Sequence, residues 1–139
     1  MRTFTLLLVV MIATATGCRS KKIKQRDLSA VKITVGQGGG FTGYYTDYII
    51  YGTGKVERYT TKDNTTKEMD RVALDSVRIW VNRIDQINFT GIDLDQPGNM
   101  SYYIYFEEPG TLHKVRWGGA VPPADLEKLY SRIWNTVNK

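Results

Sequence analysis

Apolar and polar residues alternate in three segments of the first half of the chain, which is the pattern of half-buried strands. VKITV at residues 31–35 is followed by YYTDYIIY at 44–51 and by KVERY at 55–59. The stretch Gly-Thr-Gly at 52–54 separates the last two segments and suits a tight turn. The pattern therefore predicts three strands, of which the second and third form a hairpin.

The polar segment after these strands predicts a loop that ends in a helix start. Thr65 and Glu68 have the spacing of a capping box, in which each side chain satisfies a free amide at a helix N-terminus. Apolar residues then recur at intervals of three and four up to about Ile87, which predicts an amphipathic helix. Its apolar stripe comprises Leu74, Val77, Val81, Ile84 and Ile87, with Trp80 beside it.

The second half of the chain repeats strand and helix patterns. After a break at residues 91–99, alternation resumes on both sides of Pro109-Gly110, a pair that suits the centre of a type II turn. Pro122 and Pro123 then suit the start of a final helix. The order β-β-β-α-β-β-α predicts an α+β fold, in which an antiparallel sheet of about five strands carries two helices packed on one face. The apolar stripe of the last helix comprises Leu126, Leu129, Tyr130, Ile133, Trp134 and Val137.

The glycine-rich segment GQGGGFTG, residues 36–43, contains the spacing G-x-G-x-x-G at Gly38, Gly40 and Gly43. A dinucleotide-binding loop needs this spacing between a strand and a helix, whereas here a predicted strand follows. The Lys-Ser/Thr pair of a P-loop is also absent from the segment. We therefore expect no nucleotide cofactor. We interpret the glycines as residues that allow positive φ angles and close backbone approach at the end of a strand.

Phe41 stands between these glycines, and its ring has two possible positions. The ring either folds back on the core or is offered to a partner, since a large exposed aromatic side chain is uncommon without a function. We expect the ring to cover the sheet edge in part and to leave one face for a protein ligand.

The first 17 residues have the features of a cleaved signal peptide. Arg2 precedes an apolar run at residues 4–13, which is shorter than the ~20 residues needed to span a bilayer. The following Ala15-Thr16-Gly17-Cys18 resembles the lipobox of bacterial lipoproteins. This resemblance implies a lipid anchor, such as palmitate, on Cys18 as the mature N-terminus. An ordinary secretory signal with a chance cysteine is the alternative.

Positive charge is concentrated directly after the cysteine. Residues 19–27 carry a net charge of +4, whereas from Leu28 onward basic and acidic residues number 13 each. Binding of nucleic acid requires cations clustered on a folded face, so this distribution favours an anionic lipid surface instead. We expect a lipidated basic tether at residues 18–29 and a single domain at 30–139. Arg19 stands where inner-membrane lipoproteins of enteric bacteria have an aspartate, so the resemblance to lipoproteins implies the outer membrane. The absence of an acidic cluster after Cys18 favours the periplasmic face of that membrane.

Other arrangements of reactive residues do not match a known chemistry. His113 is the sole histidine and Cys18 is the sole cysteine, so the chain offers no second histidine or cysteine as a metal ligand. The segment at 93–98 begins like a calcium loop, but Pro97 and Ile104 occupy positions that such a loop gives to other residues. We therefore predict a protein that is not an enzyme and that holds no cofactor or metal.

Short motifs in the domain resemble those of known families. The run Gly39-Gly40-Phe41-Thr42-Gly43, Pro97 with the tyrosine-rich strand after it, and His113–Gly118 with Val121-Pro122-Pro123 resemble small lipoproteins of Bacteroidota. The layout is similar, more distantly, to the emfourin family of metalloprotease inhibitors. This second resemblance implies inhibition of a thermolysin-like metalloprotease, although the anchor and the polar insertion at 52–68 depart from that family.

We predict from these features a membrane-anchored periplasmic lipoprotein that acts as a protein-interaction module of the cell envelope. Its partner would be an envelope protein or a protease, and an emfourin-like inhibitor is the alternative. The loops at 36–43, 91–99 and 117–123 are the predicted contact surface. The candidate partner-binding residues are Gly39, Gly40, Phe41, Thr42, Gly43, Asn99 and Trp117.

Overall fold

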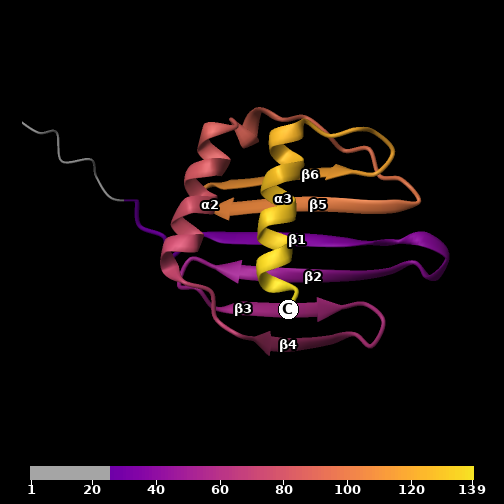
Figure 1. Ribbon diagram of the computed structural model, residues 1–139, viewed down its shortest axis with the longest axis horizontal. Helices are drawn as coiled ribbons and strands as arrows, with labels where there is room; N and C mark the ends of the chain where they lie inside the picture. Colours follow the sequence, from indigo (N-terminus) through magenta and orange to yellow (C-terminus); the bar gives the residue numbers. More distant parts are fainter. Residues whose placement is uncertain (1–25) are drawn as a thin grey trace, which may run out of the picture.

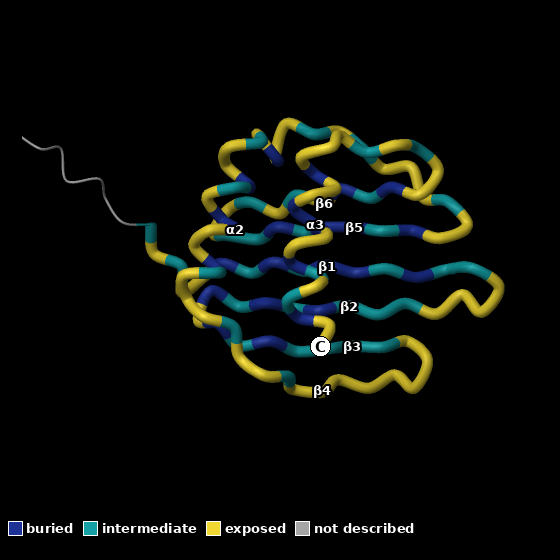
Figure 2. The backbone as a smooth tube through the Cα atoms, in the orientation of Figure 1, coloured by how far each residue is buried: buried dark blue, intermediate teal, exposed yellow. Residues whose placement is uncertain are grey.

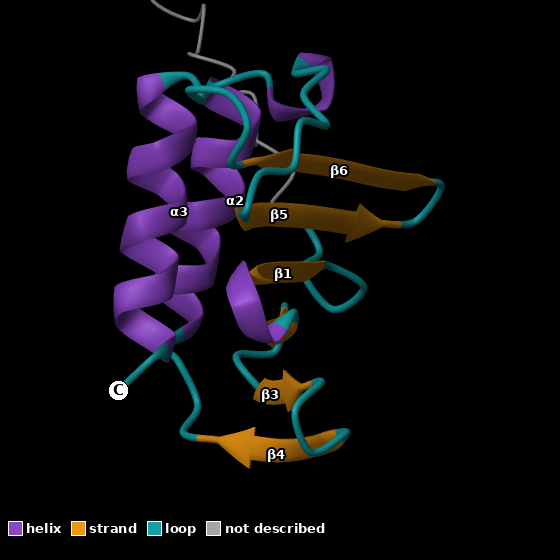
Figure 3. Ribbon diagram, turned by 90° about the vertical axis from the view of Figure 1, so that its right-hand side faces the viewer, coloured by secondary structure: helices purple, strands orange, loops and turns teal. Residues whose placement is uncertain are grey.

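The computed structural model describes residues 26–139, which form one antiparallel six-stranded sheet with two helices on one face (Figures 1 and 3). The predicted signal peptide at 1–17, Cys18 and the tether up to residue 25 lie outside the described residues. The elements are β1 Lys32–Gly39, β2 Tyr44–Tyr51, β3 Val56–Thr60, β4 Thr65–Met69, α2 Leu74–Gln86, β5 Met100–Glu108, β6 Thr111–Trp117 and α3 Ala124–Val137.

The strand order is β4-β3-β2-β1-β5-β6, so β1 lies inside the sheet and pairs with both β2 and β5. The first four strands follow one another as a meander, and α2 then carries the chain back to the other side of β1. The predicted α+β class, the antiparallel sheet and the helices on one face are confirmed. The sheet has one strand more than the five expected.

The additional strand is β4, where a capping box and a helix start were predicted. Thr65 and Glu68 belong to an edge strand that pairs with β3, and α2 begins only at Leu74 after Ala73. Asn64 adopts a positive φ of 50° and closes the turn between β3 and β4. The capping-box prediction is therefore wrong, because β-branched threonines beside a turn residue favour a hairpin here.

The core lies between the helices and the sheet face that they cover, and buried positions recur along the central strands (Figure 2). Strand residues on this face include Ile33, Val35 and Phe106, all almost fully buried. Both helices contribute the apolar stripes expected from their spacing, except that Leu74 at the start of α2 is 49% exposed. No helix within residues 26–139 combines the length and the hydrophobicity that crossing a membrane requires.

The glycine-rich segment differs from the predicted loop. Strand β1 continues through Gly36 and Gly38 to Gly39, and only Gly40–Thr42 form a short 3-10 turn. The turn between β5 and β6 agrees with the sequence prediction, since Gly110 has a φ of 78°. The prediction that the first strand ends before the glycines is therefore wrong.

Candidate functional site

Parts of the three predicted contact loops meet at one end of the sheet, where β1 ends and β5 begins (Figure 1). The amide of Gly40 donates to the carbonyl oxygen of Asn99 at 2.5 Å. The amide of Gly119 donates to the carbonyl oxygen of Gln96 at 2.9 Å. We use the term apex for residues 39–44 together with Asn99 and Met100.

The backbone of the apex requires glycine. Gly39 has φ 109° and ψ −138°, a combination that is largely confined to glycine. A side chain at this position would also place its Cβ atom 2.4 Å from the carbonyl oxygen of Asn99. The glycines therefore set the path of the turn that carries Phe41.

The side chain of Phe41 is fully exposed, with a relative accessibility of 108%. The expectation that its ring covers the sheet edge in part is therefore wrong. The 3-10 turn directs the ring away from the sheet, and the adjacent Gly40 has no side chain to pack against it. Tyr44 and Met100 of the apex are also exposed apolar residues, so the apex presents three exposed apolar side chains.

Trp117 does not belong to this exposed surface. Its side chain is 5% exposed and lies on the face of β6 that the helices cover. The indole ring packs edge-on against Tyr130 of α3 with the ring centroids 5.3 Å apart. The prediction that Trp117 contacts a partner is therefore corrected, because α3 folds back over the residue after the loop at 117–123.

The opposite face of the sheet carries a second notable group, which sequence reasoning did not identify. No helix of residues 26–139 covers this face (Figure 3). Strand register and the alternation of side chains place five of the nine tyrosines on it. We use the term tyrosine face for this surface, whose tyrosines are Tyr45, Tyr51, Tyr59, Tyr103 and Tyr105.

Two glycines of β1 make room for these rings. Gly36 pairs with Tyr103, and a Cβ atom at Gly36 would lie 2.2 Å from the Tyr103 ring. Gly38 pairs with Tyr45 on the other side, where a Cβ atom would lie 2.6 Å from the Tyr45 ring. The glycines that resemble a phosphate loop in the sequence thus leave room for the Tyr103 ring and for the close approach of β2 at Tyr45.

The Tyr103 hydroxyl donates a hydrogen bond to the carboxylate of Asp47 across β1. Tyr103 is buried, with a relative accessibility of 4%, and Asp47 is half-buried. Burial raises the pKa of Asp47 above that of an ordinary aspartate, although the hydrogen bond from Tyr103 offsets part of this effect. Burial also raises the pKa of Tyr103, and the hydrogen bond to Asp47 adds to that shift.

Replacement of Asp47 by asparagine should raise the melting temperature at pH 7. A raised pKa in the folded state means that the folded protein holds this proton more tightly than the unfolded chain does. Stability from this site therefore falls as pH rises through the pKa of Asp47. Asparagine keeps an acceptor for Tyr103 without the charge. Thermal melts should differ at pH 7 and converge at a pH where the aspartate is protonated; equal melting temperatures at pH 7 would contradict this.

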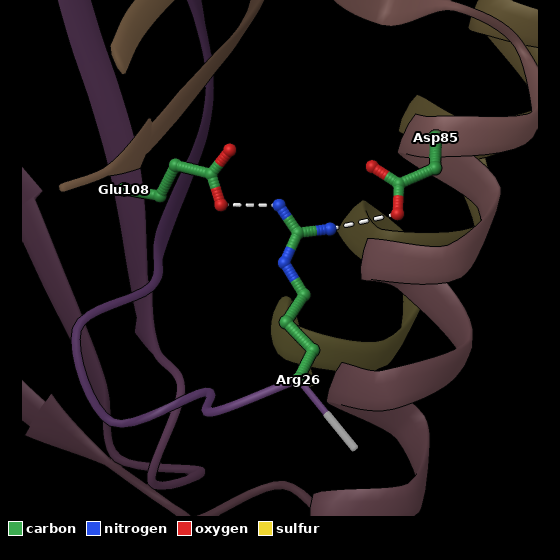
Figure 4. Close-up of polar contacts among 3 residues, drawn as sticks. All are labelled: Arg26, Asp85 and Glu108. Carbon is green, nitrogen blue, oxygen red and sulfur yellow. Dashed lines mark hydrogen bonds and ion pairs between the residues drawn. The ribbon is translucent and has the colours of Figure 1, made fainter. Parts of the chain in front are cut away.

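Arg26 fixes the point at which the chain enters the domain. Its guanidinium donates to Asp85 of α2 at 2.7 Å and also to Glu108 at the end of β5 (Figure 4). The guanidinium carbon lies 5.6 Å from the centroid of the Phe106 ring. The last four residues of the predicted tether, 26–29, therefore include a side chain that binds two elements of the domain.

Replacement of Arg26 by glutamine should lower the free energy of unfolding by about 1 kcal/mol, because it removes two charge-assisted hydrogen bonds from a partly exposed site. Exchange of the Val31 amide, which donates to Leu28, should accelerate as the chain entry loosens. Urea denaturation and hydrogen exchange measure both effects. Arg132→Gln is the matched control, since Arg132 forms no ion pair with another of residues 26–139.

The sequence features considered for metal or catalytic chemistry have structural partners. His113 makes a 2.9 Å hydrogen bond through Nε2 with the carbonyl oxygen of Ile92, and its ring packs edge-on against Phe89. Asp95 accepts a hydrogen bond from Arg116 at 2.7 Å, which holds the pKa of this carboxyl below its usual value. Within the described part of the chain, no three potential metal ligands form a group.

Comparison of the chain with protein-family models and with curated proteins finds no match. The resemblances to lipoproteins and to emfourins therefore stay predictions.

Proposed function

We propose that the chain is a non-enzymatic protein-interaction module that binds its partner through the apex. The observation that carries the proposal is the fully exposed ring of Phe41 on a turn whose path the glycines determine. An aromatic ring held on a defined backbone loses little entropy when it enters a pocket, and such residues often dominate binding energy. Asn99, whose carbonyl oxygen accepts from Gly40, lies beside the turn with an exposed side chain.

A tether on lipidated Cys18, at the periplasmic face of the outer membrane, is part of this proposal. Arg26 binds Glu108 at the end of the sheet opposite the apex (Figure 1). The eight residues of β1 separate the two ends by about 25 Å. An anchor before Arg26 would therefore hold the apex away from the lipid surface, where an envelope protein is accessible.

Inhibition of a thermolysin-like metalloprotease is the alternative proposal. The segment at 39–43 that carries the resemblance to emfourins is also the exposed turn of the apex. A purified domain that inhibits such a protease in a peptide-cleavage assay would favour this alternative. An interaction module would leave the protease active and would be recovered with an envelope protein.

Replacement of Phe41 by alanine should leave the melting temperature unchanged, because the ring makes little contact with the domain. It should weaken partner binding by about 2 kcal/mol or more, roughly 30-fold. Photo-crosslinking from position 42 in the membrane-bound chain, followed by recovery of the crosslinked partner, measures the loss. Leu112→Ala removes another exposed apolar side chain, at the start of β6 and away from the apex, and should not change recovery. Equal recovery with Phe41→Ala would exclude the apex.

A further inference from the structure

Asp47 differs from the other carboxylates of the tyrosine face. Glu57 lies 2.7 Å from the Lys55 ammonium, and Glu68 lies 3.7 Å from the same group. Glu107 lies 2.6 Å from the ammonium of Lys32. Asp47 forms no ion pair with a lysine or arginine of residues 26–139, and its hydrogen-bonding side-chain partner among them is the Tyr103 hydroxyl. A half-buried carboxylate near the middle of this face therefore lacks a cation.

Three tyrosines are neighbours of Asp47 on this face. Tyr59 is directly opposite Asp47 on β3, and Tyr45 is two residues away on β2, so both side chains share its face. Tyr103 lies across β1 on β5, with its ring centroid 6.3 Å from that of Tyr45. The face of an aromatic ring carries partial negative charge and attracts a cation. A cation bound by the carboxylate would therefore also be attracted by the neighbouring rings.

The tyrosine face already holds two of the chain's own lysines in this way. The ammonium of Lys114 lies 5.1 Å from the centroid of the Tyr105 ring. The ammonium of Lys55 lies 5.6 Å from the centroid of the Tyr51 ring and also pairs with Glu57. Tyr51, Lys55 and Glu57 thus form a complete set of ring, ammonium and carboxylate, whereas Tyr45, Tyr59 and Asp47 lack the ammonium.

We propose that Asp47 binds the ammonium group of a lysine side chain from a protein partner, with the lysine stem against Tyr45 and Tyr59. This site lies on the tyrosine face, and its occupation does not depend on the role of Phe41 at the apex. A lysine supplies the missing positive charge and hydrogen-bond donors for the free carboxylate oxygen. A neutral sugar would supply donors without charge, and a metal ion would require more oxygen ligands than a single carboxylate offers.

The test uses acetyl-trilysine amide as a probe, titrated into the ¹⁵N-labelled full chain. We expect saturable shifts of the Tyr45, Asp47 and Tyr59 amides at millimolar concentration, and about tenfold weaker binding by Asp47→Asn. Asp63→Asn is the matched control, because it removes the same charge from an exposed position in the turn between β3 and β4 and should bind as the wild type does. Thermal melts verify that each variant is folded.

Tyr45→Leu tests the aromatic part of the site with the carboxylate intact, and it should weaken trilysine binding severalfold. The proposal is overturned if Asp47→Asn binds trilysine as the wild type does, or if the shifts lie away from the tyrosine face. It is also overturned if maltotriose, a neutral oligosaccharide, shifts these amides and trilysine does not. Weaker binding by both Asp47→Asn and Tyr45→Leu, with wild-type binding by Asp63→Asn, supports it.

Discussion

Replacement of Gly39 by alanine should lower the free energy of unfolding by about 3 kcal/mol. Alanine is strained at the φ of 109° that Gly39 adopts. Its Cβ atom would also lie 2.4 Å from the carbonyl oxygen of Asn99. This oxygen is a backbone atom, so relieving the contact would require the start of β5 to move. Urea denaturation of the purified variant measures the change.

Gly43→Ala is the control that separates the two causes. Gly43 also has a positive φ, of 64°, but a Cβ atom at this position meets no other atom within 4 Å. We therefore expect backbone strain alone, and a loss of about 1 kcal/mol. If both variants lose the same stability, the close contact between a Cβ atom at position 39 and the Asn99 carbonyl oxygen adds nothing to the cost of Gly39→Ala.

Replacement of Tyr103 by alanine should cost about 3 to 5 kcal/mol, the range for deletion of a buried aromatic ring. Its ring lies over Gly36, stacks on Tyr105 with the centroids 4.9 Å apart, and is shielded from solvent. The deletion would leave a void beside Gly36 and would remove the hydrogen-bond donor of Asp47. Chemical denaturation should show the loss as an earlier unfolding midpoint.

Tyr103→Phe separates the contribution of the ring to the free energy of unfolding from that of the hydroxyl group. Phenylalanine keeps the ring over Gly36 but leaves the half-buried Asp47 carboxylate without its donor, at a cost of about 1 to 2 kcal/mol. A Tyr103→Ala variant no less stable than Tyr103→Phe would show that the ring adds nothing to the sheet. That result would also remove the physical reason for glycine at position 36.

Several elements were predictable because their signals are local. Strand β2 has the bounds that the alternation at 44–51 predicts, and α3 begins directly after Pro123 as its spacing suggests. The capping box failed because its spacing is also compatible with a strand. Thr65 and Thr66 find backbone partners in Thr60 and Tyr59 of β3, and a pattern of side chains alone does not reveal that pairing.

The candidate site was predictable only in part. The glycine run in the sequence indicated where the apex lies. The argument against a nucleotide-binding loop needed only the prediction that a strand, not a helix, follows the glycines, and β2 is that strand. The surroundings of Phe41 and Trp117 depend instead on what packs over them: α3 covers the indole, and nothing among residues 26–139 covers the phenyl ring. Both residues lie beside glycines in the sequence, so local composition does not distinguish them.

The α+β class, the amphipathic helices and most strand positions follow from periodicity over a few neighbouring residues, so they can be read from the amino-acid order alone. Which rings are exposed, and which carboxylate lacks a cation among residues 26–139, depends on how the strands and helices pack together. Asp47 and Tyr103 are 56 positions apart and meet because β1, with glycine at position 36, lies between their strands. Such contacts follow from strand order and register, which are set by the packing of the whole sheet rather than by any one segment.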